Sequence, residues 1–212
     1  MGENKVVEQG AIEEEHDAPF PLTERDKFAL DQKDEDFELH TWDELEEAIS
    51  TNKLDILTRK PSDLRRYLTW CWKIHREYGS ISNYIIQHRL PWGSPPFEYI
   101  SPIPFAEVDD YKILINDWPY GFTKDITHIV VWSKTPIPTD EETGDLTSES
   151  RKILQEFVDR TFVDRLDGSH ERVLWFKNWV KLQSVRALEH MHVLVRNASE
   201  EDLEHWTGRK LE

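Results

Sequence analysis

The sequence of 212 residues contains a single cysteine, Cys71. One thiol excludes both an intrachain disulfide and a cysteine-rich zinc site. We therefore expect a protein of a reducing compartment, cytoplasmic and able to enter the nucleus passively. The N-terminal residues lack the apolar core of a signal peptide, and Val6 disfavours N-myristoylation.

Long apolar runs and positive charge are also scarce. No run of about 18 apolar residues occurs, so we expect no membrane span. Lys and Arg number 26 against 42 Asp and Glu, which gives a formal net charge of −16. Broad contact with nucleic acid or anionic membrane depends on basic side chains, so neither is an expected partner. A small nucleotide in a local pocket remains allowed.

Acidic side chains gather at the N-terminus. Residues 1–40 hold 13 acidic against 4 basic side chains, so about −9 of the charge lies there. The segment "EQGAIEEEHD" has no period that would bury one face. We predict an acidic, disordered or loosely docked arm over 1–38, a helical layer over 39–100, an α+β region over 101–198 that forms one folded unit with that layer, and a C-terminal tail over 199–212.

Three amphipathic patterns in the first half predict helices. Thr41 is a suitable N-cap with a glutamate three residues later, which predicts a helix over 42–50. A longer pattern begins after Ser62 as a cap and ends at Gly79. A third helix is expected over about 82–89, before a turn-rich stretch.

From Tyr111 onward the pattern changes to short β-branched segments. "YKILIN", "THIVVW", "RVLWFKNW" and "EHMHVLVR" are typical of strands, and the amphipathic "LTSESRKILQEFVDRTF" lies between the second and third. The order is therefore strand, strand, helix, strand, strand. We predict an α+β fold with an antiparallel sheet and an amphipathic helix, covered by the N-terminal helical layer.

Two histidines stand two residues apart in the last strand. His190 and His192 therefore project to one side of it, whereas Glu189, Met191 and Val193 face the other. An imidazole nitrogen can attack phosphorus, and a neighbouring imidazole can bind the phosphate or move its proton. The pair is thus the candidate catalytic centre.

Three blocks, "ILINDWPYG", "THIVVWSK" and "FKNWVKLQSVRALEHMHVLV", resemble in this order the histidine-triad family of nucleotide hydrolases and transferases, over about 85 residues. The resemblance implies a histidine-triad (HIT-like) sheet in which His190 is the central, nucleophilic histidine and His192 the last of the triad. It also implies that Asn116 lies near the nucleoside. It assigns phosphate oxygens to three further residues: Asn178, Gln183 and Ser184.

The sequence departs from that family at several positions. Leu188 stands where the first histidine is usual, and Trp132 replaces a common proline. One extra residue separates Ser184 from the histidine pair, and the usual glycine before Gln-Ser is missing. Loss of an orienting histidine lowers activity. An alternative is therefore a non-catalytic binding or regulatory protein with a degenerate site, and a second is that the histidines have a purely structural role.

Further side chains could join the site. His128 could replace the missing histidine, although a structural role is favoured for a lone histidine in a strand. Lys134 and Lys177 are either phosphate neighbours or solvated lysines. Together His128, His190 and His192 would supply three nitrogens for zinc, but no His-Glu-x-x-His motif or acidic cluster supports that reading. We therefore expect neither a metal nor a cofactor. The aromatic segments "PWGSPPFEY" and "NDWPYGF" are candidates for the wall of a pocket.

Residues 40–197 as a whole look like the fungal N-acetylglucosamine-induced protein family. The resemblance rests on "NDWPYG…HIVVWSK" and "WFKNW…SVRALEHMHVLV" after the helical "WDELEEAIS…LRRYLTWCWKIHREYGSISNYII". It implies a link to the amino-sugar response and no particular reaction. We expect a hydrolase or transferase whose partner is a small nucleotide or nucleotide sugar. The histidine-triad resemblance allows a homodimer.

Overall fold

The fold is α+β with one open, four-stranded antiparallel sheet. The computed structural model describes residues 22–179, 182–183 and 185–210. The strands lie in the order β1-β2-β4-β3, so the last strand of the chain is central in the sheet. Their bounds are Tyr111–Ile115 for β1, Ile126–Ser133 for β2, Val173–Phe176 for β3 and Glu189–Arg196 for β4.

Six α-helices lie in the described residues. The second half of the chain runs β1, β2, α5, β3, β4, which confirms the predicted order of strand, strand, helix, strand, strand. The helices are α1 Glu24–Asp31, α2 Trp42–Ser50, α3 Pro61–Tyr78, α4 Ile81–His88, α5 Ser148–Val158 and α6 Glu200–Thr207. One π-helical turn follows α5 at Asp159–Val163. Short 3-10 turns lie at Asp34–Asp36, Leu54–Ile56, Val108–Asp110, Asp164–Leu166 and His170–Arg172. No helix of this described part is long and apolar enough to cross a membrane.

The predicted helix ends are confirmed except at the start of α3. Thr41 caps α2 through a capping box, and Gly79 ends α3 in the left-handed conformation with φ 77°. Ser62 is not the cap of α3: Lys60 takes that position and Pro61 is the first helical residue, where a missing N–H costs nothing. The backbone N–H of Ser62 instead donates to the Asp34 carboxylate at 2.8 Å.

Two helices, α1 and α6, lie in segments for which the sequence analysis named no element. Both begin with a capping box in which aspartate takes the usual place of glutamate, and the cap is Thr23 for α1 and Ser199 for α6. The helix α1 docks on α3, where Arg65 donates to the carbonyl of Leu30 at 2.9 Å. The helix α1 thereby becomes part of the helical layer.

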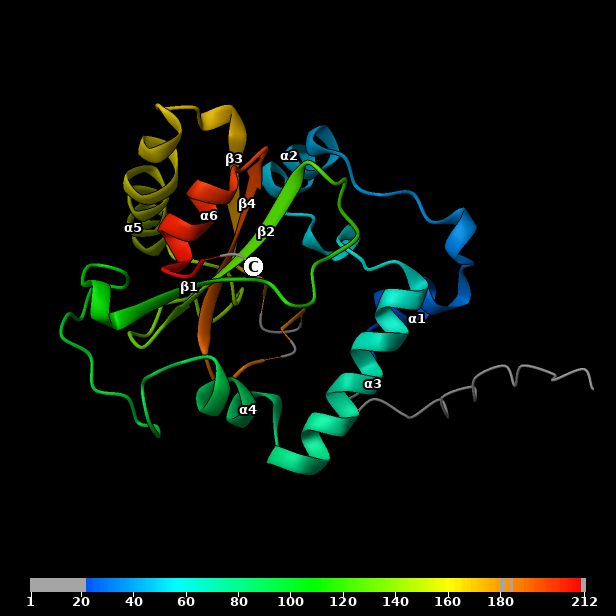
Figure 1. Cartoon of the computed structure of the whole chain (residues 1–212), viewed down its shortest axis with the longest axis horizontal. Helices are drawn as coiled ribbons and strands as arrows, with labels where there is room; N and C mark the ends of the chain where they lie inside the picture. Colours follow the sequence, from blue (N-terminus) through cyan, green and yellow to red (C-terminus); the bar gives the residue numbers. More distant parts are fainter. Residues whose placement is uncertain (1–21, 180–181, 184, 211–212) are drawn as a thin grey trace, which may run out of the picture.

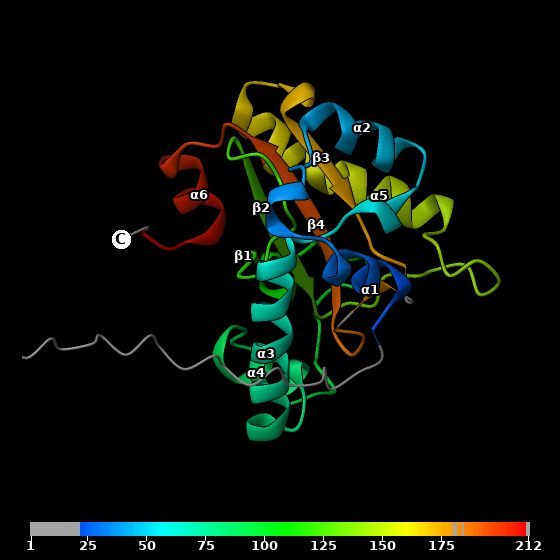
Figure 2. The same ribbon diagram turned by 90° about the vertical axis from the view of Figure 1, so that its right-hand side faces the viewer.

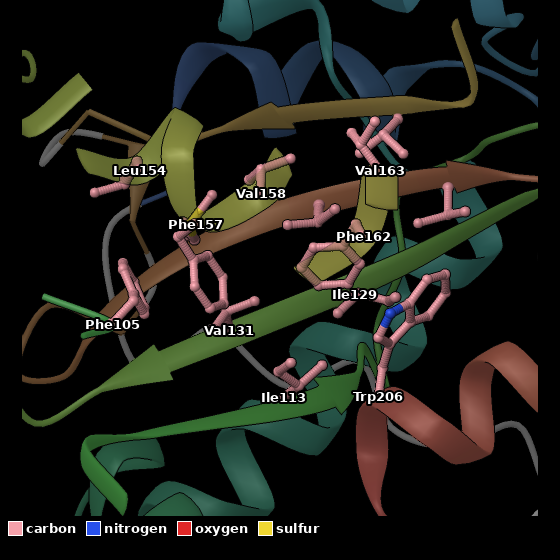
Figure 3. Close-up of a cluster of buried hydrophobic side chains, with 14 of the residues drawn as sticks. Phe105, Ile113, Ile129, Val131, Leu154, Phe157, Val158, Phe162, Val163 and Trp206 are labelled. Atoms are coloured by element: carbon pink, nitrogen blue, oxygen red, sulfur yellow. The ribbon is translucent and has the colours of Figure 1, made fainter. Parts of the chain in front are cut away.

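One face of the sheet packs against α5 and α6. Figure 1 shows these two helices together on the same side of the strands. Their contact with the sheet is an aromatic and aliphatic core, in which the rings of Phe105 and Phe157 stack with centroids 4.6 Å apart. Figure 3 shows this core with side chains from β1, β2, α5 and α6, among them Ile113, Ile129, Val131, Leu154, Phe157 and Trp206.

The opposite face of the sheet carries the even-numbered side chains of β2 and β4 and is covered by the N-terminal helices. Leu114, Val130 and Trp132 pack there with residues of α1, α3 and α4, and Leu194 packs with α2. Figure 2 looks at the side on which α1 and α3 lie. The candidate histidines project from this face, so the helical layer encloses them.

The loop between β1 and β2 is tied to the N-terminal segment at Gly121. Its N–H donates to the carbonyl of Thr58 at 2.9 Å, and its carbonyl accepts from the N–H of His40 at 2.8 Å. A Cβ at this position would lie 2.5 Å from the ring of Phe37, so any other residue would require that ring to move. This contact fixes the loop that carries Asn116 and Tyr120.

Candidate functional site

A cavity of about 580 Å³ lies between this face of the sheet and the helices α1, α3 and α4. Its size is within the range of small-molecule sites. The structure brings five of the predicted site residues to its wall: Asn116, Asn178, Gln183, His190 and His192. Ser184, the sixth, lies outside the described residues.

His190 presents one free nitrogen to the cavity. Its Nδ1 lies 2.8 Å from the carbonyl oxygen of Leu188, and a carbonyl can only accept, so the proton of the neutral ring is on Nδ1. Across the described ranges Nε2 has no hydrogen-bond partner. Burial, helped by the charge of Lys177 and opposed by the hydrogen bond to Leu188, lowers the pKa of His190 to about 4. At neutral pH the ring is therefore uncharged, with the lone pair of Nε2 available.

His192 is engaged at both ring nitrogens. Its Nδ1 lies 2.9 Å from Nε2 of His128, and its Nε2 lies 3.2 Å from Nδ2 of Asn178. The amide of Asn116 continues the chain of contacts, with Nδ2 3.2 Å from Nδ1 of His128. Burial holds the pKa of His192 well below its usual value and lowers that of His128 to about 3. The network is thus uncharged and can orient His192 without protonating it.

Tyr120 connects this network to two arginines that the sequence analysis did not single out. Its hydroxyl accepts from Nδ2 of Asn178 at 3.1 Å, and its ring stacks on His128 with centroids 5.4 Å apart. The guanidinium carbons of Arg25 and Arg59 lie 5.7 and 4.9 Å from the Tyr120 ring centroid. Isolated arginines follow no sequence pattern, whereas the "NDWPYGF" segment around Tyr120 was a candidate wall and does line the cavity.

Aromatic side chains form much of the remaining wall. Trp70 lies 5.4 Å from Trp118 and from Tyr84 between ring centroids, and all three line the cavity. The ring of Trp132 lies 4.7 Å from that of His190. Trp70 of α3 therefore packs against the core and also faces the cavity, where flat rings suit a planar group of a ligand.

Other candidates lie away from this cavity. Lys134 is 3.9 Å from the Asp110 carboxylate, and Lys177 is 3.3 Å from that of Glu189. Neither lysine lines the cavity, and of the "PWGSPPFEY" segment Trp92 lines a different hollow. Within residues 22–179, 182–183 and 185–210, no group of three or more His, Cys, Asp or Glu side chains is placed to hold a metal ion.

Comparison with known proteins finds relatives that share most of this region. Residues 41–196 match the family model described as "Protein of unknown function (DUF3605)". N-acetylglucosamine-induced protein 1 of Candida albicans is 29% identical over 177 residues, which cover 76% of this chain and 69% of the relative. The uncharacterized protein YPL067C of Saccharomyces cerevisiae is 28% identical over 158 residues, which cover 73% and 77%. The crystal structure of HTC1 superposes with a TM-score of 0.63 at 25% identity, covering 79% of this chain and 93% of that chain.

Proposed function

Because this chain belongs to the DUF3605 family, whose description names no reaction, we propose its function from the cavity: hydrolysis or transfer at the phosphorus of a nucleotide or nucleotide sugar, with His190 as nucleophile. The observation that carries the proposal is the neutral imidazole of His190, with its proton held at Nδ1 and Nε2 free in the cavity. An uncharged, oriented imidazole is the form that can attack.

The reaction would proceed in two displacements. The Nε2 lone pair forms an N–P bond while the bond from phosphorus to the bridging oxygen breaks, and the leaving group departs with that electron pair and takes up a proton. Water, or another acceptor hydroxyl, then attacks phosphorus, loses its proton and releases Nε2. Asn178 and Gln183 line the same wall, and the proposal assigns phosphate oxygens to their amide N–H groups. These groups would have to exchange their present contacts, which for Asn178 are Tyr120 and His192 and for Gln183 the carbonyl of Asn178.

Two resemblances support this proposal to different extents. The Candida albicans relative confirms the likeness to N-acetylglucosamine-induced proteins, and a nucleotide sugar as substrate is consistent with that name. The histidine-triad likeness remains part of the proposal. It is supported by the antiparallel sheet with His190 and His192 side by side on its central strand.

A second candidate function is binding without turnover. Leu188, at the position of the missing first histidine, is 3% exposed and packs in the apolar core, so its side chain brings no polar group to His190. His192, whose ring nitrogens are both engaged, has no free nitrogen for the leaving group. A regulatory protein that senses a nucleotide or sugar metabolite would keep the cavity. It would need neither a first histidine at position 188 nor a free nitrogen on His192.

A chromatographic turnover assay tests the proposal. The panel comprises dinucleoside polyphosphates, nucleoside phosphoramidates and nucleotide sugars, with wild type, His190→Ala, and His75→Ala as a control at an exposed histidine of α3. We expect product with wild type and His75→Ala, and none with His190→Ala at unchanged circular dichroism. If the wild type turns over no compound but a ligand raises its melting temperature, the protein binds the ligand without catalysis.

A further inference from the structure

The cavity of His190 has a cationic end built from widely separated segments. Arg25 comes from α1, and Arg59 precedes α3, yet both guanidinium groups lie over Tyr120. The hydroxyl of Tyr120 contacts Asn178, and Asn178 contacts His192. A single ring therefore separates these two positive charges from the histidine network, in a protein whose net charge is −16.

Arg25 has buried donors without an acceptor. Its side chain is 11% exposed, and in the part of the chain that the structure describes neither Nε nor Nη1 has a hydrogen-bond partner. The Asp26 carboxylate is 3.9 Å from Nε through Oδ1. Its other oxygen accepts from the N–H and hydroxyl of Thr23, at 3.2 and 2.6 Å, in the cap of α1. Buried N–H groups of a charged side chain cost free energy until an acceptor reaches them.

The other arginines of the cavity wall already donate to protein acceptors. Arg59 donates through Nε and Nη2 to the carbonyl of Trp118, at 3.2 and 2.8 Å. Arg89 binds the carboxylate of Asp117. Nε of Arg89 is also buried without an acceptor, but Asp117 holds the rest of that guanidinium group. Arg25 lines the cavity with two such nitrogens, beside an arginine whose position is already fixed.

We propose that Arg25 binds the phosphate group of the ligand, with the charge of Arg59 behind it, and that α1 is therefore part of the binding site. A guanidinium donates two parallel hydrogen bonds to a phosphate, which a point charge cannot match. The inference rests on the proposed function and extends it. It also adds to the site a helix that precedes the family-matched residues 41–196.

The test compares nucleotides with their uncharged nucleosides in the full chain. AMP and UMP are titrated against adenosine and uridine by calorimetry, with wild type, Arg25→Gln, Arg25→Lys and Lys27→Gln. Lys27 is the matched control, because it lies on the same helix with a side chain that is 56% exposed and paired with Glu24.

Arg25→Gln should weaken AMP and UMP binding by about tenfold or more while leaving nucleoside binding unchanged. Arg25→Lys should recover part of the loss, and Lys27→Gln should match the wild type. Unchanged nucleotide affinity in Arg25→Gln overturns the inference but not the role of His190, which turnover measures separately. Equal losses for nucleotides and nucleosides overturn it in favour of a structural role for α1. If the wild type binds neither AMP nor UMP, the inference is overturned, and the turnover panel decides the role of His190 separately.

Discussion

His128 and His192 meet diagonally across the β2–β4 pair. In the strand register His128 is opposite Leu194 and His192 is opposite Val130, yet Nε2 of His128 lies 2.9 Å from Nδ1 of His192. Both rings are buried, so a proton on either one would place a charge beside the other in apolar surroundings. The pair is therefore stable only while it is neutral.

Stability should fall as the pH drops from about 6.5 toward 4. Burial lowers the pKa of His128 from 6.5 to about 3 and that of His192 in the same direction. Between the two values the unfolded chain binds protons that the folded chain does not, so the free energy of unfolding decreases with falling pH. The loss is about 1.4 kcal/mol per pH unit for each such histidine. Urea titrations at about pH 7 and about pH 5.5 measure it.

The matched pair for this measurement is His128→Gln and His75→Gln. The first removes one buried titrating ring and should flatten the dependence of unfolding free energy on pH. The second removes an exposed ring of α3 and should leave the dependence as in the wild type. Equal slopes in His128→Gln and wild type would contradict a neutral, buried His128.

Turnover should depend on pH through His190. The neutral ring is the nucleophile and its pKa lies at about 4, so the rate constant kcat/KM should be flat from about pH 8 down to about pH 5 and fall below that. Initial rates in overlapping buffers give the profile. A decline centred near pH 6.5 would mean that a histidine in an ordinary, solvated environment controls the reaction.

Restoring a histidine at the Leu188 position should destabilise the protein. Leu188 is 3% exposed in an apolar cluster, so an imidazole there loses its water without an assured partner. We expect Leu188→His to cost about 1–3 kcal/mol and not to raise turnover. Leu188→Met keeps the volume and the backbone carbonyl that holds His190, and should cost less than about 1.5 kcal/mol. Thermal melts and turnover assays of both variants test this prediction. Higher turnover of Leu188→His at an unchanged melting temperature would refute it.

The aromatic core behind the sheet should be sensitive to truncation. Phe157 is fully buried and stacks on Phe105, so Phe157→Ala should cost about 3–5 kcal/mol. Phe28 is 66% exposed on α1, and Phe28→Ala should change stability by less than about 0.5 kcal/mol. Chemical denaturation gives the free energy of unfolding of both variants. The prediction is wrong if the two variants lose similar amounts of it.

Local signals predicted the elements whose pattern is strong. Thr41 and Gly79 mark helix ends by their own chemistry, and period-two patterns place the strands. The helices α1 and α6 have weaker apolar stripes, but Thr23 and Asp26, or Ser199 and Asp202, do form capping boxes. Accepting aspartate as well as glutamate at the third helical position would have found both.

The site was predictable only in part. Strand alternation is enough to place His190 and His192 on one face, because the side-chain period of a strand is fixed. The meeting of Arg25, Arg59 and Tyr120 depends on how α1 docks on α3 and how Gly121 holds the loop, which are contacts between distant segments. No local spacing contains that information.

The strand order has a consequence for how the protein is made. β4 is the last strand to leave the ribosome, yet it lies between β2 and β3 and carries both site histidines. Until it arrives, β2 and β3 have no common partner, and β2 can pair only with β1. The four-stranded sheet and the cavity wall that holds both histidines therefore cannot form before β4 has been made, and until then the growing chain is open to aggregation and to chaperones.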